Sequence, residues 1–217
     1  MTPDLFADAA PALDDEVLAP GAGVLRGLAG PCAPQLKDDL ARVTAAAPFR
    51  HLVTPGGYRM SVAMTNCGEL GWVSDRRGYR YDRIDPDSGA PWPPLPASFL
   101  ALAREAAARA GYPDFAPEAC LVNCYRPGAR LSLHQDRDEA DRQAPIVSVS
   151  LGLPAVFLWG GDQRGAPVRK VALNHGDVVV WGGPSRLRFH GVQALKAGEH
   201  PFAGECRINL TFRKVSA

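Results

Sequence analysis

The sequence predicts a mainly β domain, a sandwich or a barrel, with two helices against one of its outer faces. After Gly111, short runs rich in β-branched and aromatic residues follow one another, separated by Gly, Pro, Asn or Asp. Helical patterns occur only before that point. The chain has 217 residues, 46% of them hydrophobic, which suits one domain with a substantial core.

Two segments have the spacing of helices. Residues 34–47 carry apolar side chains at helical intervals. Residues 96–111 begin with a proline, are rich in Ala and Leu, and end at Gly111, a residue suited to a helix C-terminus. We expect both helices to cover the same face of the β structure.

The remaining elements are strands and one long connection. Residues 58–73 predict strands joined by a turn at Asn66 to Gly68, and residues 71–96, rich in Gly and Pro, predict a long loop of functional importance. The strands expected after Gly111 are 119–125, 146–153, 155–159, 168–173, 177–181, 186–190 and 206–212.

Composition excludes several classes of protein. The formal charge of +1 gives no global field for nucleic acid, so such a partner must be argued from a local site. The five cysteines contain no CxxC pair, which argues against zinc fingers and a disulfide framework. No apolar run reaches membrane-spanning length, and the first residues are acidic, so we expect a soluble cytoplasmic protein.

The segment SLHQDRDEADRQ, residues 132–143, places a histidine two residues before an aspartate. In a strand, residues i and i+2 share a face, so His134 and Asp136 can point at one metal ion. The tripeptide alone is a weak signal, but a sandwich can bring His190 beside it. Two histidines and one carboxylate match the facial set of non-haem Fe(II) oxygenases. Zinc is the competing metal.

A second group of polar residues suggests a dianion site. Arg207, Asn209 and Arg213 have the same parity in one strand, and arginine forks match carboxylates. Even spacing inside an apolar strand argues against the alternative of solvated edge arginines. Asn123 and Tyr125 likewise share one face of their strand. An Fe(II) site beside a site for a small dicarboxylate implies 2-oxoglutarate as co-substrate.

With these residues in place, the sequence closely resembles the AlkB family, the Fe(II)- and 2-oxoglutarate-dependent dioxygenases that reverse alkylation damage in DNA. The resemblance runs from DLFADA near the start to NLTFR near the end. Its most specific stretches are VTPGGYRMSVAMTNCGELGW, AGYPDF, PGARLSLHQDRDE, APIVSVSLGLPAVF, HGDVVVWGGPSRLRFHG and CRINLTFR. It implies a double-stranded β-helix (jelly-roll) core with flanking helices. Residues 1–96 would form an N-terminal extension and nucleotide-recognition lid, and residues 97–217 the catalytic core.

The resemblance also assigns residues to the metal and the co-substrate. The implied iron ligands are His134, Asp136 and His190. The implied contacts to 2-oxoglutarate are Asn123, Tyr125, Arg207, Asn209 and Arg213. We assign the carboxylate farther from the metal to Arg207.

The activity implied is oxidative demethylation of bases of the 1-methyladenine and 3-methylcytosine type. Reduction of O2 would be coupled to conversion of 2-oxoglutarate to succinate and CO2, and the methyl group would leave as formaldehyde. The implied partners are single- and double-stranded DNA, with RNA left open. We expect a monomer with no obligate protein partner.

The substrate pocket is expected to hold an extruded, cationic base. The resemblance implies that Trp72 faces His134 across the base, and the electron-rich ring of Trp72 suits a cationic base. Asp138 would accept from the exocyclic amine, and the remaining pocket residues implied are Met64, Tyr79 and Arg164. The segment 74–83 interleaves arginines with tyrosines, a pattern for phosphate contact. The plainer alternatives are core packing for Met64 and a solvated loop for 74–83.

Three residues depart from the family pattern. Cys124 stands where a basic residue is familiar, Arg137 replaces a lysine, and Trp159 is larger than expected and could alter the pocket. Since Cys124 points away from its neighbours' face, we expect co-substrate binding to persist.

Two other classes remain open on the sequence. A cupin-like hydrolase or isomerase would act without 2-oxoglutarate and would give the two arginines no role. A catalytically silent nucleic-acid-binding module would keep binding after loss of His134. The complete set of ligands and arginines argues against the second.

Overall fold

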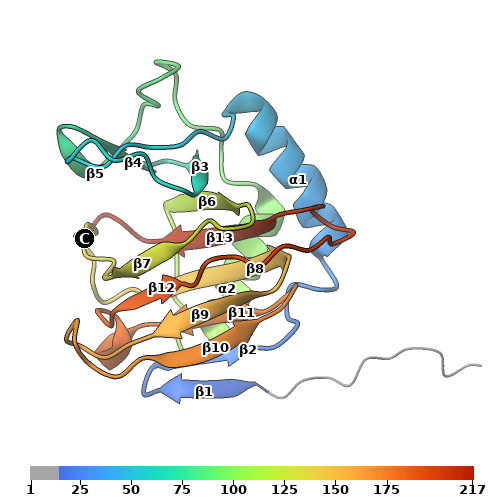
Figure 1. Ribbon diagram of the computed structural model, residues 1–217, viewed down its shortest axis with the longest axis vertical. Helices are drawn as coiled ribbons and strands as arrows, with labels where there is room; N and C mark the ends of the chain where they lie inside the picture. The colour runs from blue at the N-terminus through green and yellow to red at the C-terminus, as the bar shows by residue number, and fades with distance from the viewer. Residues whose placement is uncertain (1–14) are drawn as a thin grey trace, which may run out of the picture.

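Two antiparallel sheets pack face to face in the computed structural model, which describes residues 15–217 (Figure 1). The larger sheet has seven strands. Their order is β1 (Glu16–Ala19), β2 (Ala22–Leu25), β11 (Val178–Trp181), β8 (Ile146–Gly152), β13 (Arg207–Arg213), β6 (Ala119–Tyr125) and β3 (Ala63–Gly68). The smaller sheet has the order β10 (Arg169–Leu173), β9 (Ala155–Trp159), β12 (His190–Val192) and β7 (Leu131–His134). The predicted β sandwich of jelly-roll type is confirmed.

Both helices lie on the outer face of the larger sheet. The helices α1 (Ala33–Ala46) and α2 (Ala97–Arg109) contact each other, and α2 also contacts β8 and β11. Phe99 of α2 meets Phe212 of β13 edge to face, with ring centroids 6.2 Å apart. The expected helices and their common face are confirmed.

Alternation along the strands divides the core in two. In β11, Val178 and Val180 belong to the cluster shared with the helices, whereas Val179 and Trp181 belong to the cluster between the sheets. A strand residue points to the opposite face from its neighbours, so a continuous apolar run can serve both layers.

Residues 71–96 are more ordered than the sequence predicted. The strands β4 (Gly71–Asp75) and β5 (Gly78–Asp82) form a separate hairpin within the expected loop. The expected turn at Asn66 to Gly68 is also wrong, because β3 continues through Gly68. Gly and Pro suggested a loop, but Trp72, Val73, Tyr79 and Tyr81 give the hairpin cross-strand side chains to pair.

Two further expectations need correction. Residues 186–190 are not a strand: the 3₁₀ helix η1 (Gly183–Ser185) and a turn precede β12, which begins only at His190. Asp136 is likewise not in the strand of His134, since β7 ends at that histidine. The segment that follows β7, rather than the strand itself, therefore brings the side chain of Asp136 beside that of His134.

The first part of the chain contributes to the core sheet. β2 pairs with β11, and β3 pairs with β6. β1, β2 and β7 had no counterpart among the expected strands. The DLFADA segment lies outside the described residues. No helix among residues 15–217 is long and apolar enough to cross a membrane.

Candidate active site

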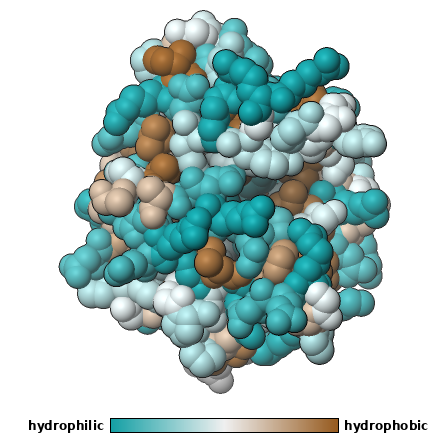
Figure 2. Space-filling view, turned by 90° about the vertical axis from the view of Figure 1, so that its left-hand side faces the viewer, coloured by the Kyte–Doolittle hydropathy of each residue, from teal (hydrophilic) through white to brown (hydrophobic). Residues whose placement is uncertain are grey.

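A pocket of about 680 Å³ lies between the two sheets and is bordered by the β4–β5 hairpin. Its walls come from β3, β6, β8, β11 and β13 of the larger sheet and from β7, β9 and β12 of the smaller one. The face on the left of Figure 1 is mostly hydrophilic, with hydrophobic side chains only in small separate areas (Figure 2).

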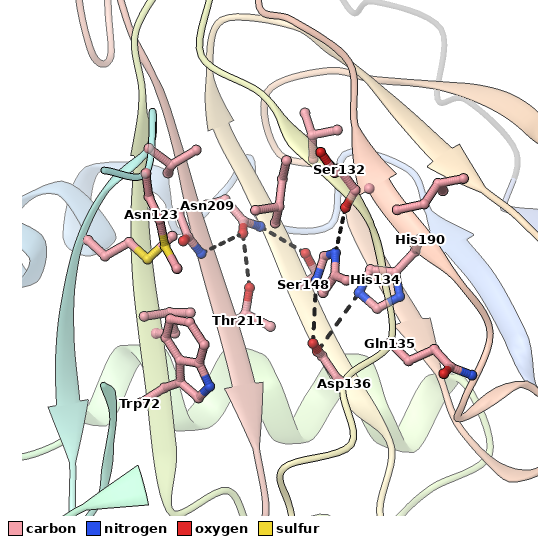
Figure 3. Close-up of a pocket in the computed structure, with 18 of the residues that line it drawn as sticks. Trp72, Asn123, Ser132, His134, Gln135, Asp136, Ser148, His190, Asn209 and Thr211 are labelled. Carbon is pink, nitrogen blue, oxygen red and sulfur yellow. Dashed lines mark hydrogen bonds and ion pairs between the residues drawn. The ribbon is translucent and has the colours of Figure 1, made fainter. Parts of the chain in front are cut away.

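Strand pairing brings the two histidines of the expected triad together. β12 pairs with β7 so that His190 lies directly opposite His134, and the two ring centroids are 4.4 Å apart. The chain beyond β7 then turns Asp136 toward both rings (Figure 3). The Nε2 atoms of His134 and His190 are 3.5 and 3.9 Å from the carboxylate oxygens of Asp136.

The donor set fits a divalent iron. One ligand atom from each of the three residues lies within 4.8 Å of the others, and no other such group of three occurs in residues 15–217. Nδ1 of His134 donates to the carbonyl of Ser132 at 2.9 Å, and Nδ1 of His190 to that of Arg188 at 3.0 Å. Each Nε2 is thereby left free to bind a metal.

The surroundings of the triad favour the ligand forms of His190 and Asp136. Burial and the nearby charge of His134 lower the pKa of His190 to about 4, so its imidazole is neutral at pH 7. Burial acts to raise the pKa of Asp136, but the charge of Arg213 and the hydrogen bond to His134 outweigh it. The pKa of Asp136 is held well below its usual range. Burial acts to lower the pKa of His134, but Asp136 outweighs it and raises that pKa.

Arg213 links the triad to the second polar group. Its Nη2 and Nε donate to Oδ2 of Asp136 at 2.7 and 3.0 Å. Arg213 is 7% exposed, and its Nη1 has no partner among the described residues. A guanidinium nitrogen is therefore buried beside the metal ligands and available to an acceptor.

Arg207 lies at the other end of the same strand face. It is 1% exposed, its guanidinium lies over the ring of Tyr125, and its Nη2 donates to Oγ of Ser150 at 2.9 Å. Burial lowers the pKa of Arg207, an effect that Tyr125 partly offsets. Nε and Nη1 of Arg207 have no partner within residues 15–217. Buried donors without acceptors are costly, so this end of the pocket fits an anionic ligand.

Amide and hydroxyl groups fill the space between the two arginines. Nδ2 of Asn123 donates to Oδ1 of Asn209 at 3.2 Å, and Nδ2 of Asn209 donates to Oγ of Ser148 at 2.8 Å. The Thr211 hydroxyl donates to the same Asn209 oxygen, as Figure 3 shows. Ser148 and Thr211 were not predicted. Thr211 has the same parity in β13 as the predicted residues of that strand, and Ser148 of β8 lies directly opposite Thr211.

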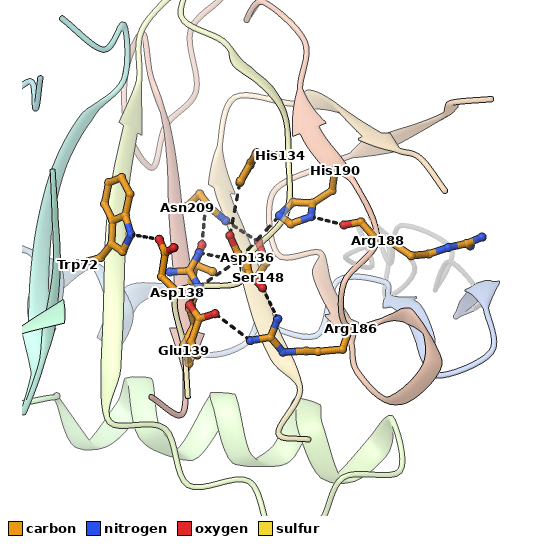
Figure 4. Close-up of polar contacts among 12 residues, drawn as sticks. Trp72, His134, Asp136, Asp138, Glu139, Ser148, Arg186, Arg188, His190 and Asn209 are labelled. Atoms are coloured by element: carbon orange, nitrogen blue, oxygen red, sulfur yellow. Dashed lines mark hydrogen bonds and ion pairs between the residues drawn. The ribbon is translucent and has the colours of Figure 1, made fainter. Parts of the chain in front are cut away.

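A buried charge network behind Asp136 was missed by the sequence reading. Glu139 was not among the predicted site residues, yet it is 3% exposed, and Arg186 donates to it at 3.0 Å (Figure 4). The Tyr81 hydroxyl of the hairpin also donates to Glu139, at 2.6 Å. Nothing in the charged segment 132–143 distinguished Glu139, because its partners come from distant parts of the chain.

The hairpin brings two aromatic residues to the pocket. Trp72 and Tyr79 stack with ring centroids 5.5 Å apart, and Trp72 lies across the pocket from His134 (Figure 3). Nε1 of Trp72 donates to Oδ2 of Asp138 at 3.0 Å. One oxygen of Asp138 is thus held by the hairpin.

The other two expected substrate residues also line the pocket. Met64 is 3% exposed and packs in the cluster between the sheets, so it has a packing role as well. Arg164 donates to the carbonyl of Leu133 at 2.8 Å and lies over the ring of Phe189.

The three departures from the family pattern have different surroundings. Cys124 points away from the pocket, toward the cluster beneath the helices. Arg137 borders the pocket and is exposed. Trp159 is not among the lining residues and packs behind two of them, Phe157 and Trp181.

Comparison with known proteins gives a consistent result. Residues 21–213 match the profile of the 2OG-Fe(II) oxygenase superfamily. The chain is 60% identical over 212 residues to the alpha-ketoglutarate-dependent dioxygenase AlkB of Escherichia coli strain K12, covering 98% of this chain and 97% of that one. It is 38% identical over 96 residues to the human nucleic acid dioxygenase ALKBH1, covering 44% of this chain and 24% of that one. The solved structure of OsALKBH1 superposes with a TM-score of 0.81 at 29% identity, over 93% of this chain and 100% of that one.

Proposed function

This chain belongs to the AlkB family of 2OG-Fe(II) oxygenases, and on that premise we propose how its pocket removes alkyl groups from nucleic-acid bases. The enzyme is an Fe(II)- and 2-oxoglutarate-dependent dioxygenase of oxidative dealkylation repair. One observation carries the assignment: a facial donor set of two histidines and an aspartate shares a pocket with two buried arginines that retain unpaired donors.

His134, Asp136 and His190 would hold the iron. Three protein ligands leave positions open for the co-substrate and for O2. Bound iron and 2-oxoglutarate supply the oxidising chemistry, in which 2-oxoglutarate becomes succinate and CO2 and the oxidised methyl group leaves as formaldehyde. The protein's part is to keep His190 neutral, Asp136 ionised and both rings oriented.

The co-substrate would lie along the face of β6 and β13. Arg207 would bind the carboxylate farther from the metal, because Arg213 is already beside Asp136 while Arg207 lies six positions earlier in β13 with two free donors. Asn123, Tyr125 and Asn209 would complete the contacts. The hydrogen bond from Asn123 to Asn209 holds the two amides in place before the ligand arrives.

The damaged base would enter between Trp72 and His134. Bases methylated at adenine N1 or cytosine N3 pair poorly and are cationic, so their extrusion is cheaper and aromatic stacking favours them. Asp138 would accept from the exocyclic amine with the oxygen that Trp72 leaves free. Met64, Tyr79 and Arg164 would close the remaining sides.

The β4–β5 hairpin is the part of the expected N-terminal lid that would contact nucleic acid. It stands outside both large sheets, and Arg76, Arg77 and Arg80 lie in or beside its turn. We propose DNA as the partner, with RNA tested in parallel. We further propose that the chain acts as a monomer, which light scattering of the purified protein tests directly.

The deciding experiment uses anaerobically purified protein supplied with Fe(II), 2-oxoglutarate and air. Single-stranded DNA and RNA oligonucleotides of one sequence, each with one 1-methyladenine, are the substrates, and formaldehyde and base mass are measured. We expect formaldehyde from the DNA with the wild-type protein and none with Asp136→Ala. Lys170→Ala, an exposed change on β10, is the matched control.

The outcome separates this function from the two alternatives. Absence of formaldehyde from the wild type, or an equal yield from Asp136→Ala, contradicts the proposal. Turnover that persists without 2-oxoglutarate would indicate the cupin-like hydrolase instead. Oligonucleotide binding without any turnover would indicate a silent binding module.

A further inference from the structure

Strands β6 and β13 bring two cysteines together behind the co-substrate end of the pocket. Their pairing places Ile208 opposite Cys124 and Arg207 opposite Tyr125. Cys206 precedes β13 by one residue, so it is the diagonal neighbour of Cys124 on the face turned away from the pocket. Both cysteines therefore adjoin residues assigned to 2-oxoglutarate without lining the pocket themselves.

These two thiols have the access and the chemistry for oxidation. Both are partly exposed, and the pairing of β6 with β13 makes them diagonal neighbours on one face. The hydrogen bond with Cys124 lowers the pKa of Cys206 to about 7. The positive charge of Arg126 also lowers this pKa, whereas burial acts to raise it. The same bond, together with burial, raises the pKa of Cys124. The lowered pKa makes Cys206 the more reactive thiol near neutral pH. In the structure its Sγ donates to the carbonyl of Ala203 at 3.0 Å, a bond that it gives up when it ionises.

The other cysteines of the chain lack this combination. Cys67 and Cys120 lie directly opposite each other in β3 and β6, but both are fully buried. Cys32 is partly exposed, and burial raises its pKa. The chain thus contains an inaccessible cysteine pair and a less reactive single cysteine as internal controls.

We propose that Cys124 and Cys206 form a dithiol that a peroxide oxidises to a disulfide, and that the disulfide weakens 2-oxoglutarate binding at Arg207. The first part is independent of the proposed function, and the second part rests on it.

The oxidation is a two-electron step. The Cys206 thiolate attacks one oxygen of hydrogen peroxide, and the O–O bond breaks. The sulfur becomes a sulfenic acid, and the departing hydroxide takes up one proton and leaves as water. The Cys124 sulfur then attacks that sulfenic sulfur and loses its proton. The S–S bond forms, the S–O bond breaks, and a second water leaves.

The position of the pair explains why binding should change. Diagonal neighbours in an antiparallel pair have Cα atoms about 7 to 8 Å apart. A disulfide favours about 5.5 to 6 Å, so its formation must draw the chain at Cys206 toward β6. Cys206 lies just outside the regular strand and is followed directly by Arg207, so that shift moves the arginine. The bond is strained and therefore reversible.

Mass spectrometry of the full-length protein tests the site. The protein is freed of iron with a chelator, treated with hydrogen peroxide, blocked at remaining thiols and digested without reductant. We expect a peptide pair joined through Cys124 and Cys206, lighter than its free peptides by two hydrogen atoms and released by dithiothreitol. Cys206→Ser and Cys124→Ser should abolish it, and Cys32→Ser should not. Absence of this link in the wild type, with Cys206 remaining open to alkylation, overturns the proposal.

Calorimetric titration of 2-oxoglutarate tests the coupling, with Mn(II) in place of iron. We expect oxidation to raise the dissociation constant about tenfold, the size of effect expected when one hydrogen bond between charged groups is weakened. Reduction should restore it, and Cys206→Ser should not respond to peroxide. A linked protein with unchanged affinity overturns the coupling alone. If neither form binds 2-oxoglutarate while the link forms, the proposed function fails and the dithiol site remains.

Discussion

At the residue scale, the pocket is organised around buried charges that compensate one another. Asp136 is 9% exposed and Arg213 is 7% exposed, and each would be costly to bury alone. Their ion pair, at 2.7 Å, keeps the carboxylate ionised before any ligand binds. Arg207 has no such carboxylate partner among the described residues, so it is the cation that most needs an anionic ligand.

Replacing Arg207 tests this difference. Arg207→Met retains much of the length of the side chain but removes its charge. We expect the KM for 2-oxoglutarate to rise about 10- to 100-fold, since hydrogen bonds between charged groups contribute about 1.5 to 3 kcal/mol. Initial rates of formaldehyde release at varied 2-oxoglutarate measure the change. Lys170→Met is the matched control, and an unchanged KM in Arg207→Met would refute the assignment.

The reactivity of Cys206 gives a pH-dependent prediction. Since the pKa of Cys206 is lowered to about 7, its thiolate fraction and alkylation rate should increase as pH rises through about 7. The rate for Cys32 should increase only at higher pH, because burial raises its pKa. Timed iodoacetamide labelling with peptide mapping measures both rates in one sample. In Cys124→Ala the midpoint for Cys206 should move upward, and an unchanged midpoint would exclude the hydrogen bond as its cause.

At the scale of elements, the metal site depends on the close approach of β12 to β7. Gly191 follows His190, and a Cβ at this position would lie 2.6 Å from the carbonyl oxygen of Leu131. The backbone atoms of Ser132 and Leu133 would also be too close, at 3.1 and 3.2 Å. Only glycine lets the two histidine-bearing strands pair at this distance.

Gly191→Ala should therefore weaken metal binding without removing a ligand. The added methyl group must push β12 away from β7, at a cost of about 1 to 3 kcal/mol in stability. We expect weaker Mn(II) binding, measured by anaerobic calorimetry, and a lower Tm. Gly165→Ala is the control, because a Cβ there meets nothing within 4 Å. Equal metal affinity in the two variants would disprove the role of the close approach.

The hairpin connects the proposed base pocket to the buried charge network. Tyr81 of β5 donates to Glu139, while Trp72 of β4 donates to Asp138. Both acceptors follow the metal ligand Asp136 by two or three residues in the chain. The hairpin and the candidate metal site are thus connected through one short segment. The sequence suggested neither contact, because 71–96 resembled a loop in composition.

At the scale of the molecule, ligands should stabilise the whole fold because the site joins both sheets and the hairpin. At 100 times its dissociation constant, a ligand adds about 2.7 kcal/mol. For a chain of this size, that corresponds to a rise in Tm of about 5 to 10 °C. We expect Mn(II) and 2-oxoglutarate to raise Tm in separate steps in differential scanning calorimetry.

Two variants distinguish the rise in Tm caused by Mn(II) from the rise caused by 2-oxoglutarate. Arg207→Met should keep the rise due to Mn(II) and lose most of the rise due to 2-oxoglutarate. Asp136→Ala should lose the rise in Tm due to Mn(II). If Arg207→Met and the wild-type protein responded equally to 2-oxoglutarate, the co-substrate would not be bound where we place it.

The sequence by itself determined the residue types and the strand faces on which they lie. Alternation is a local property of the backbone, so the shared face of Arg207, Asn209 and Arg213 followed from spacing alone. Likewise, the β-rich second half and both helices followed from local patterns of apolar residues.

Only the tertiary structure decided which of those faces meet. The pairing of His190 with His134, the burial of Glu139 by Arg186 and the approach of Cys206 to Cys124 join residues 47 to 82 positions apart. These contacts depend on strand order and on turns outside regular strands. No local pattern encodes that order, because it is fixed by how the whole chain buries its apolar surface.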